Sequence, residues 1–198
     1  DVYKRQFEKL MKAISKSLKK NDPNHLNLGI RYGYIEQLDD ELLRISKESF
    51  DALSFNCYAL SPDHEKMNHA LEISGLPMII GEYHFGTVDR GLAQSLWQVN
   101  SQKERGDAFR YYTENAFAHR GLIGTGWFRW IDQNINGRTD GENYNCGFID
   151  VTDRPYPYMV DAAIETAKSL YEIHSGTKTP FHQAPNAVGH SPIPDLWE

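Results

Sequence analysis

The stretch Leu76-Pro77-Met78-Ile79-Ile80-Gly81-Glu82-Tyr83-His84-Phe85-Gly86 is the strongest strand signal in the chain. It begins at a proline, which is tolerated at the first residue of a strand. The apolar run that follows predicts a strand buried on both faces, as in a parallel sheet. The run stops at Glu82, where the strand would leave the core, and we interpret Glu82 as a catalytic carboxylate. A solvated or ion-paired glutamate is the alternative, because position in a fold does not prove function.

Helix and strand signals alternate on both sides of this stretch. Apolar residues at helical spacing predict helices from Phe7 to Leu18, after a cap at Asp39 or Asp40, and over 64–73, 103–119 and 159–171. Short apolar segments predict strands at 25–30, at 51–57, from Pro77 and at 122–130. This alternation implies parallel strands joined by right-handed crossovers.

Four parallel strands fit either an open doubly wound sheet or half of an eight-stranded barrel. No glycine-rich phosphate loop follows any of the predicted strands, which disfavours a nucleotide-binding doubly wound fold. In barrels of this kind the chemistry lies at the C-terminal ends of the strands. The residues that follow the predicted strands are therefore the candidate site.

The composition of the chain limits the classes of function that it can have. The chain has 198 residues, enough for one domain with a substantial core, and a formal net charge of -6. The acidic balance argues against nucleic acid as a partner, and no apolar run reaches membrane-spanning length. Cys57 and Cys146 match no zinc motif and make no disulfide framework, so we expect two buried apolar residues. We predict no cofactor.

The predicted strand ends carry groups that suit a sugar. Amide, hydroxyl, carboxylate and guanidinium groups can meet sugar hydroxyls, and aromatic rings can cover the apolar face of the sugar. The residues in question are Arg31 after the first strand, Asn56 and Tyr58 after the second, Glu82 and His84 after the third, and Trp127, Trp130 and Asp132 at the fourth.

Several motifs resemble a known family. Four segments come in the order of strands five to eight of clan A glycoside hydrolases: Asp22-Pro23-Asn24-His25-Leu26, Ser54-Phe55-Asn56-Cys57-Tyr58, Ile79-Ile80-Gly81-Glu82-Tyr83-His84 and Trp127-Phe128-Arg129-Trp130-Ile131-Asp132. With residues 86–91, 137–145 and 147–156 they resemble β-agarases of glycoside hydrolase family 50, over nearly all of residues 7–174. The resemblance implies an α/β fold, namely the C-terminal half of a (β/α)8 TIM barrel.

The same resemblance implies a retaining glycoside hydrolase with two catalytic glutamates. The nucleophile at the end of the seventh strand maps onto Glu82, and the acid/base in an Asn-Glu pair would precede residue 7. The expected partners are a polysaccharide or oligosaccharide substrate and the N-terminal half of the barrel, without nucleic acid or membrane. We therefore expect negligible hydrolysis from this fragment alone. The resemblance also implies a secreted or periplasmic full-length protein.

Each further site residue has a structural alternative. Trp130 matches the family's sugar platform, with core packing as the alternative, and Trp127 is either a substrate contact or the core partner of Trp130. Asn56 and Tyr58 either orient the nucleophile and contact sugar hydroxyls or make ordinary strand-end hydrogen bonds. His84 would lie on the same face of the strand as Glu82 and bind substrate, unless it is a hydrogen-bonded structural histidine.

The polar loop after the fourth strand offers other carboxylates. Asp132, Asp140 and Glu142 are candidate substitutes for the acid/base that would precede residue 7. The resemblance instead makes Asp132, Glu142 and Asn143 substrate-binding or loop-structuring groups. Asp132 to Gly137 resembles the start of a calcium loop, but Asn143 stands where a bidentate Glu is needed, so we predict no metal site.

The domain boundaries follow from these signals. We set residues 1–6 apart as a candidate non-native leader, assign residues 7–175 to the half-barrel, and expect an irregular tail over 176–198. The rival functions are a non-catalytic carbohydrate-binding remnant of the same fold and a clan A hydrolase of another β-glycan or β-galactoside.

Overall fold

The computed structural model describes residues 2–189, which form an α/β structure in two compact units. The first, here called the sheet unit, comprises the chain up to Cys57, Asp63–Gly81 and Gly121–Gly126. The second, the helix-pair unit, comprises Tyr58–Pro62, Glu82–Arg120 and the described residues from Trp127 onward. Two strands run from the first unit into the second, and one of them carries Glu82 just beyond the boundary.

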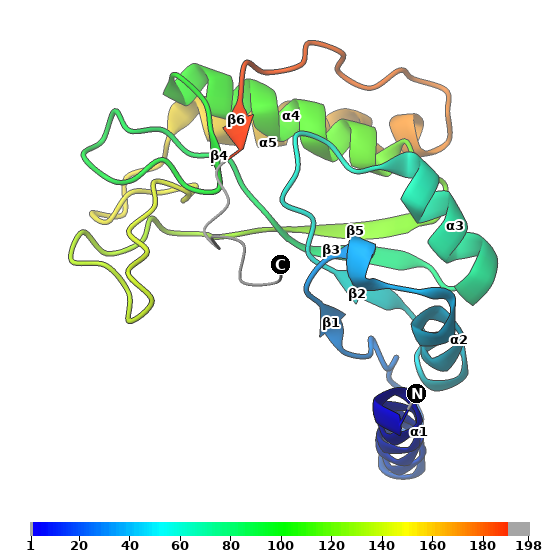
Figure 1. Cartoon of the computed structure of the whole chain (residues 1–198). Coiled ribbons are helices and arrows are strands. Elements are labelled where there is room, and N and C mark those ends of the chain that lie inside the picture. Colours follow the sequence, from blue (N-terminus) through cyan, green and yellow to red (C-terminus); the bar gives the residue numbers. More distant parts are fainter. Residues whose placement is uncertain (1, 190–198) are drawn as a thin grey trace. The chain divides into compact units, whose positions relative to one another are not determined.

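The sheet unit is built on a four-stranded sheet in the order β1-β2-β3-β5 (Figure 1). The strands are β1 Arg31–Tyr32, β2 Leu53–Phe55, β3 Met78–Tyr83 and β5 Leu122–Trp127. β1 and β2 pair in parallel, as do β2 and β3. The spatial order follows the chain order without reversal, so the prediction of a parallel α/β sheet is confirmed.

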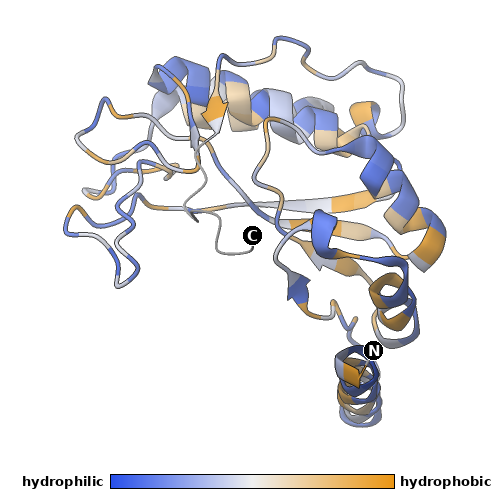
Figure 2. Ribbon diagram, in the orientation of Figure 1, coloured by the Kyte–Doolittle hydropathy of each residue, from blue (hydrophilic) through white to orange (hydrophobic). Residues whose placement is uncertain are grey.

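Strands β3 and β5 become less hydrophobic toward their C-terminal ends. Figure 2 shows hydrophobic residues at the start of β5 and a paler colour toward its end. Leu53, Met78, Ile80 and Leu122 are fully buried. Burial of this apolar surface is the main force that holds the sheet. Polar groups therefore collect where the strands end.

Helices α1 Val2–Asn21, α2 Asp40–Ser49 and α3 His64–Ser74, with the short 3-10 helix η1 Ile35–Gln37, complete the sheet unit. Asp39 caps α2 by accepting hydrogen bonds from the backbone N–H groups of Glu41 and Leu42. Asp63 caps α3 in the same way, and α3 ends at Gly75, whose φ of 67° is accessible to glycine at little cost. The predicted helices are confirmed, with α1 starting before the predicted Phe7.

The predicted strand at residues 25–30 is wrong. Strand β1 begins only at Arg31, and Leu26, Leu28 and Ile30 are exposed rather than buried. The cause lies in the backbone, because Gly29 has a φ of +72° that interrupts an extended conformation. Asn27 is held instead by the end of α2 and the residues after it, its N–H donating to the Asp51 carboxylate and its side chain to the Ser49 carbonyl.

The helix-pair unit is organised by α4 Gln102–Phe117 and α5 Pro157–His174, which pack against each other. The tail, predicted to be irregular, has two fixed points within the described residues. The Phe181 N–H donates to the buried carboxylate of Glu114 on α4, and β6 Val188–Gly189 pairs antiparallel with β4 Trp97–Gln98. The rest of that prediction, residues 190–198, lies outside the described part. Within residues 2–189, none of the helices combines the length and apolar character that a membrane crossing needs.

Candidate active site

Glu82 lies at the end of β3 with Tyr58 as a hydrogen-bond donor. The Tyr58 hydroxyl donates to Glu82 Oε2 at 2.8 Å, and both residues are half-buried. Burial raises the pKa of Tyr58 well above its ordinary value, and the hydrogen bond to Glu82 raises it further. Tyr58 therefore stays protonated and donates to the carboxylate.

His84, two residues beyond Glu82, is buried and uses both ring nitrogens. Its Nε2 accepts from the Leu96 N–H at 3.1 Å, so the proton is on Nδ1, which donates to the Phe128 carbonyl at 3.0 Å. Burial is the main cause that lowers the pKa of His84 to about 3. The structure thus favours the structural role for His84 over the predicted substrate contact, because neither nitrogen is left for a ligand.

In the sheet unit, Arg31 and Asn56 lie against the backbone at Gly81. A Cβ on Gly81 would come within 2.2 Å of Arg31 Cδ and 3.2 Å of Asn56 Oδ1. Glycine before Glu82 is therefore required by the close approach of two side chains from β1 and the end of β2. Arg31 is exposed and Asn56 half-buried.

The two tryptophans differ in their surroundings. Trp127 packs edge-on against Tyr83 at 5.2 Å and donates its indole N–H to the Cys146 carbonyl at 2.7 Å. Its ring also contacts Phe109 and Phe148. The structure favours the core role for Trp127, whose indole N–H is already bonded. Trp130 is 69% exposed and stacks on Phe148 with 5.9 Å between centroids, which leaves most of its surface open to solvent.

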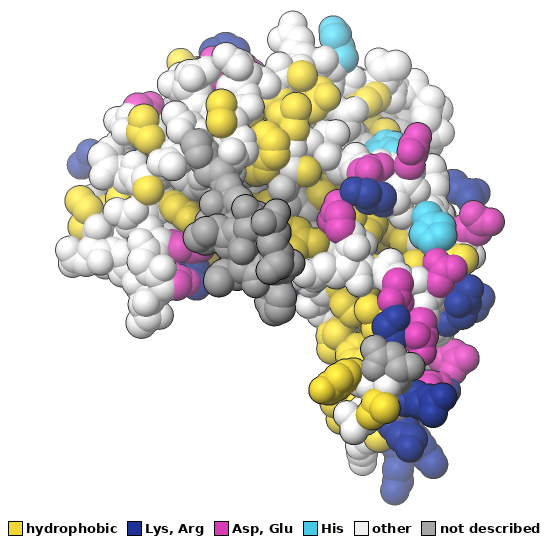
Figure 3. Space-filling view, in the orientation of Figure 1, with side chains coloured by type: hydrophobic (Ala, Val, Ile, Leu, Met, Phe, Trp, Pro, Cys, Tyr) yellow, Lys and Arg dark blue, Asp and Glu magenta, His cyan; other side chains and the backbone are white. Residues whose placement is uncertain are grey.

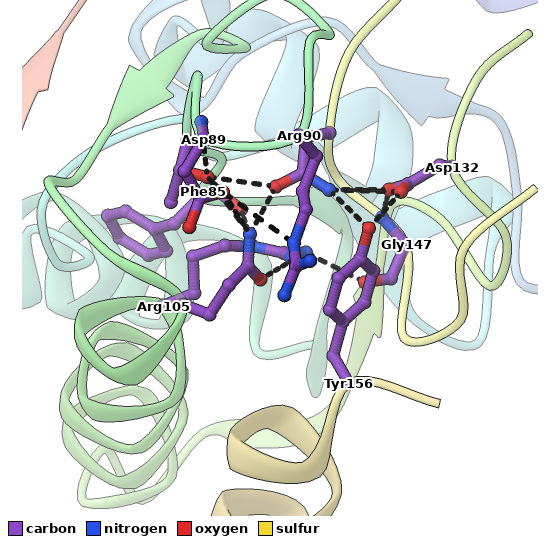
Figure 4. A network of polar contacts seen from close by, with 10 residues as sticks. Phe85, Asp89, Arg90, Arg105, Asp132, Gly147 and Tyr156 are labelled. Atoms are coloured by element: carbon purple, nitrogen blue, oxygen red, sulfur yellow. Dashed lines mark hydrogen bonds and ion pairs between the residues drawn. The ribbon is translucent and has the colours of Figure 1, made fainter. Parts of the chain in front are cut away.

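Asp132 is buried and fully engaged within the protein (Figure 4). Its carboxylate accepts from the Tyr156 hydroxyl at 2.6 Å, the Gly147 N–H at 2.7 Å and the Asn145 amide at 2.9 Å. Of the two roles predicted for Asp132, substrate binding and loop structuring, these partners support the loop-structuring one. The shared hydrogen bond helps to raise the pKa of Tyr156, after burial as the larger cause.

Arg105, which the sequence analysis missed, completes this network. Its side chain has no exposed surface and donates to the Phe85 carbonyl at 3.1 Å, the Gln102 side chain at 2.7 Å and the Gly147 carbonyl at 2.7 Å. Its guanidinium also lies over the Tyr156 ring, 5.0 Å from the centroid. Helical spacing could have predicted the burial of Arg105, because Arg105 precedes Phe109 by four positions and so lies on the same buried face of α4.

The loop between Asp132 and Asn145 is held by its own side chains. Gln133 donates to Glu142 at 2.7 Å and accepts from the Tyr144 N–H at 2.7 Å. Arg138 also donates to Glu142. The Asn143 carbonyl accepts from the Ala93 N–H at 3.1 Å. Of the two roles predicted for Glu142, these contacts support the loop-structuring one, whereas the role of the Asn143 side chain stays a prediction because its contact is made by the backbone.

In the helix-pair unit, a tyrosine-bound carboxylate lies at the end of β3, and the indole of Trp130 is exposed. In the sheet unit, Arg31 in β1 and Asn56 after β2 provide polar groups. No protein-family model matches the chain. Two curated relatives do: β-agarase A of Vibrio sp. (strain JT0107), 36% identical over 80% of this chain, and β-agarase B of the same strain, 34% identical over 82%. The chain spans only 16% and 17% of the lengths of these two relatives.

Solved structures show the same similarity. The chain is 36% identical to PfGH50B, with a TM-score of 0.79, 84% of this chain covered and 24% of that one. It is 34% identical to an exo-β-agarase, with a TM-score of 0.79 and coverage of 86% and 23%. A xylanase 10B from Thermotoga maritima, 13% identical with a TM-score of 0.51, shares the fold alone over 80% of this chain and 53% of its own. The chain is thus similar to β-agarases over a small part of their length.

Proposed function

We propose that this chain is part of a retaining glycoside hydrolase of family 50, and that Glu82 is its nucleophile. The observation that carries the proposal is the hydrogen bond from Tyr58 to Glu82 at the end of β3, in a chain similar to β-agarases. A hydrogen-bond donor on the carboxylate holds it in one orientation. The proposed substrate is an agarose-type polysaccharide with β-galactosidic linkages.

The order of the strands supports a half-barrel. A doubly wound sheet reverses its strand order at a switch point. The order β1-β2-β3-β5 has no reversal, as in one wall of a closed barrel. We propose that the strands are five to eight of a (β/α)8 barrel whose other strands come from an N-terminal half.

An exposed apolar face on the sheet unit supports the same partner. Its members lie on one side of α1 and in the segment before β1, namely Leu10, Ile14, Leu18, Leu26, Leu28 and Ile30. Figure 3 shows hydrophobic side chains on one side of α1 and Lys and Arg on the other. Exposed apolar surface next to an open sheet edge is where further strands and helices would pack.

The proposed chemistry has two steps. A Glu82 carboxylate oxygen attacks the anomeric carbon while an acid, supplied by the N-terminal half, protonates the departing oxygen. A covalent glycosyl-enzyme forms and the glycosidic bond breaks. The same acid/base then removes a proton from water, and the water displaces Glu82 with net retention. We propose that Arg31 and Asn56 bind sugar hydroxyls, and that Trp130 covers an apolar sugar face.

A trapping experiment on the full-length protein tests the proposal. A 2-deoxy-2-fluoro-β-galactoside with a good leaving group slows the second step, so the glycosyl-enzyme accumulates. Mass spectrometry of the digested protein should find the added fluorosugar on the peptide that contains Glu82. Labelling of another carboxylate would refute the assignment. Binding of agaro-oligosaccharides without any labelling or hydrolysis would favour the non-catalytic carbohydrate-binding alternative.

A further inference from the structure

His84 connects the candidate nucleophile to two backbone segments of the helix-pair unit. Its ring lies 4.9 Å from the Tyr58 ring in an edge-on arrangement, and Tyr58 donates to Glu82. We propose that His84 is a positioning residue that fixes the Tyr58 ring and, through it, the Glu82 carboxylate. This inference rests on the function proposed above and assigns to His84 a role other than substrate binding.

Aromatic rings hold the imidazole from several sides. Besides Tyr58, Tyr144 approaches edge-on at 5.8 Å and Phe128 lies tilted at 5.9 Å. Only 2% of the His84 surface is exposed. Closely packed rings of this kind transmit a displacement instead of absorbing it. A shift of the imidazole would therefore move the Tyr58 ring.

The two hydrogen bonds explain why this position needs an imidazole. The Leu96 N–H and the Phe128 carbonyl belong to segments that are 32 residues apart, and the ring offers one acceptor and one donor on its two sides. A buried N–H or carbonyl without a partner is costly, so both bonds resist rotation of the ring. A phenyl ring would keep the packing and lose both bonds.

Neutrality of His84 has a separate consequence for Glu82. The proton assignment places a lone pair on Nε2 toward Leu96 and the N–H on Nδ1 toward Phe128, and the low pKa keeps the ring uncharged in ordinary buffers. His84 thus fixes Tyr58 by shape and hydrogen bonding without placing a positive charge beside the carboxylate.

A double-mutant cycle in the full-length protein tests the inference. The variants are His84→Phe, Tyr58→Phe and the double variant, and kcat and KM are measured on an aryl β-galactoside. We expect His84→Phe to lower kcat on the order of 10²-fold with little change in KM, since small misplacements of a reacting group have effects of this size. If His84 acts through Tyr58, the double variant should be little slower than Tyr58→Phe alone.

The control is His174→Phe. His174 lies at the end of α5, and its Nδ1 also pairs with a backbone carbonyl, that of Phe117 at 2.9 Å. It should leave kcat unchanged. If His84→Phe does not fold by circular dichroism, His84→Gln, which retains a donor and an acceptor, replaces it in the same cycle. A kcat loss in the double variant equal to the product of the single losses would refute the inference, as would an unchanged kcat in the His84 variant.

Failure of this inference is distinguishable from failure of the proposed function. Suppose that the fluorosugar labels Glu82 and that the kcat loss of the double variant equals the product of the two single losses. Glu82 would then be supported as the nucleophile, and the role of His84 would be refuted. Absence of labelling at Glu82 would remove both.

Discussion

The sheet unit is distinguished by an exposed apolar face, and the helix-pair unit by charged side chains that it buries. The sheet unit leaves apolar side chains such as Leu26, which is 73% exposed, in contact with solvent. The helix-pair unit buries charged and polar side chains, including Arg105, Asp132 and Glu114, and gives each of them protein partners. Exposed apolar surface costs free energy that a partner can recover, whereas a satisfied buried network is complete by itself.

Because of this difference, we expect one region to matter for association with a partner and the other for catalysis. The exposed face of the sheet unit is available for the proposed N-terminal half. The helix-pair unit holds Glu82, Tyr58 and His84 in a connected arrangement. Changes to Glu82 or to the buried network of the helix-pair unit should therefore affect turnover or folding strongly, and changes on the exposed face of the sheet unit should affect association more than folding.

The largest expected effect is at Glu82. In the full-length protein, Glu82→Gln should lower kcat on agarose on the order of 10⁴-fold or more, because loss of a covalent nucleophile has effects of this scale. Binding of oligosaccharide, measured by calorimetry, should persist since the amide keeps the shape of the side chain. Glu172→Gln, an exposed change on α5, is the control and should change neither kcat nor binding. Near-normal turnover in Glu82→Gln would refute the assignment.

Next in size is the buried arginine. Arg105→Met should destabilise the chain by about 3–5 kcal/mol, because it leaves three acceptors and the nearby Asp132 without their cationic partner. Urea unfolding followed by circular dichroism measures the loss. Arg138→Met, on an exposed loop arginine paired with Asp140, should cost at most about 1 kcal/mol. Equal losses in the two variants would contradict the buried network as a source of stability.

A smaller, pH-dependent effect is expected at the cap of α2. The hydrogen bond from Lys4 and then the Leu42 N–H hold the pKa of Asp39 below its ordinary value. A lowered folded-state pKa means that this stabilisation is present above the unfolded pKa of about 3.9 and is lost as pH falls through the folded pKa.

Accordingly, Asp39→Ala should cost about 1 kcal/mol at pH 7, and the difference from the wild-type chain should shrink in acid. Asp39→Asn keeps a capping oxygen and serves as the control, with a smaller loss at pH 7. Urea midpoints at both pH values provide the measurement, and a loss that grows in acid would contradict the sign.

The smallest effect on folding is expected on the exposed face of α1. Ile14→Lys should change the free energy of unfolding of this chain by no more than about 0.5 kcal/mol, since the side chain is exposed. The same variant should weaken association with a separately produced N-terminal half. Leu43→Ala on α2, where the side chain is fully buried, should instead cost about 2–5 kcal/mol. A large loss of stability in Ile14→Lys would show that this face is part of the core.

Much of the fold could be predicted because its signals are local. The predicted cap at Asp39 acts on N–H groups two or three residues away, and Gly75 ends α3 at the next position. The apolar run from Met78 to Ile80 predicted the strand β3 correctly, but not its burial on both faces, since Met78 and Ile80 are fully buried and Ile79 between them is only half-buried. The strand at 25–30 failed because apolar content alone does not reveal the positive φ of Gly29.

The sequence by itself determined the alternation of elements, the position of Glu82 at a strand end and the set of polar and aromatic residues around the strand ends. Only the tertiary structure decided which of these side chains are bonded to other parts of the protein. His84, Asp132 and Trp127 find their partners far along the chain, at Leu96, Tyr156 and Phe109 among others. Such partners are set by the packing of whole elements, because a hydrogen bond requires atoms within about 3 Å, and spacing in sequence carries no such distance.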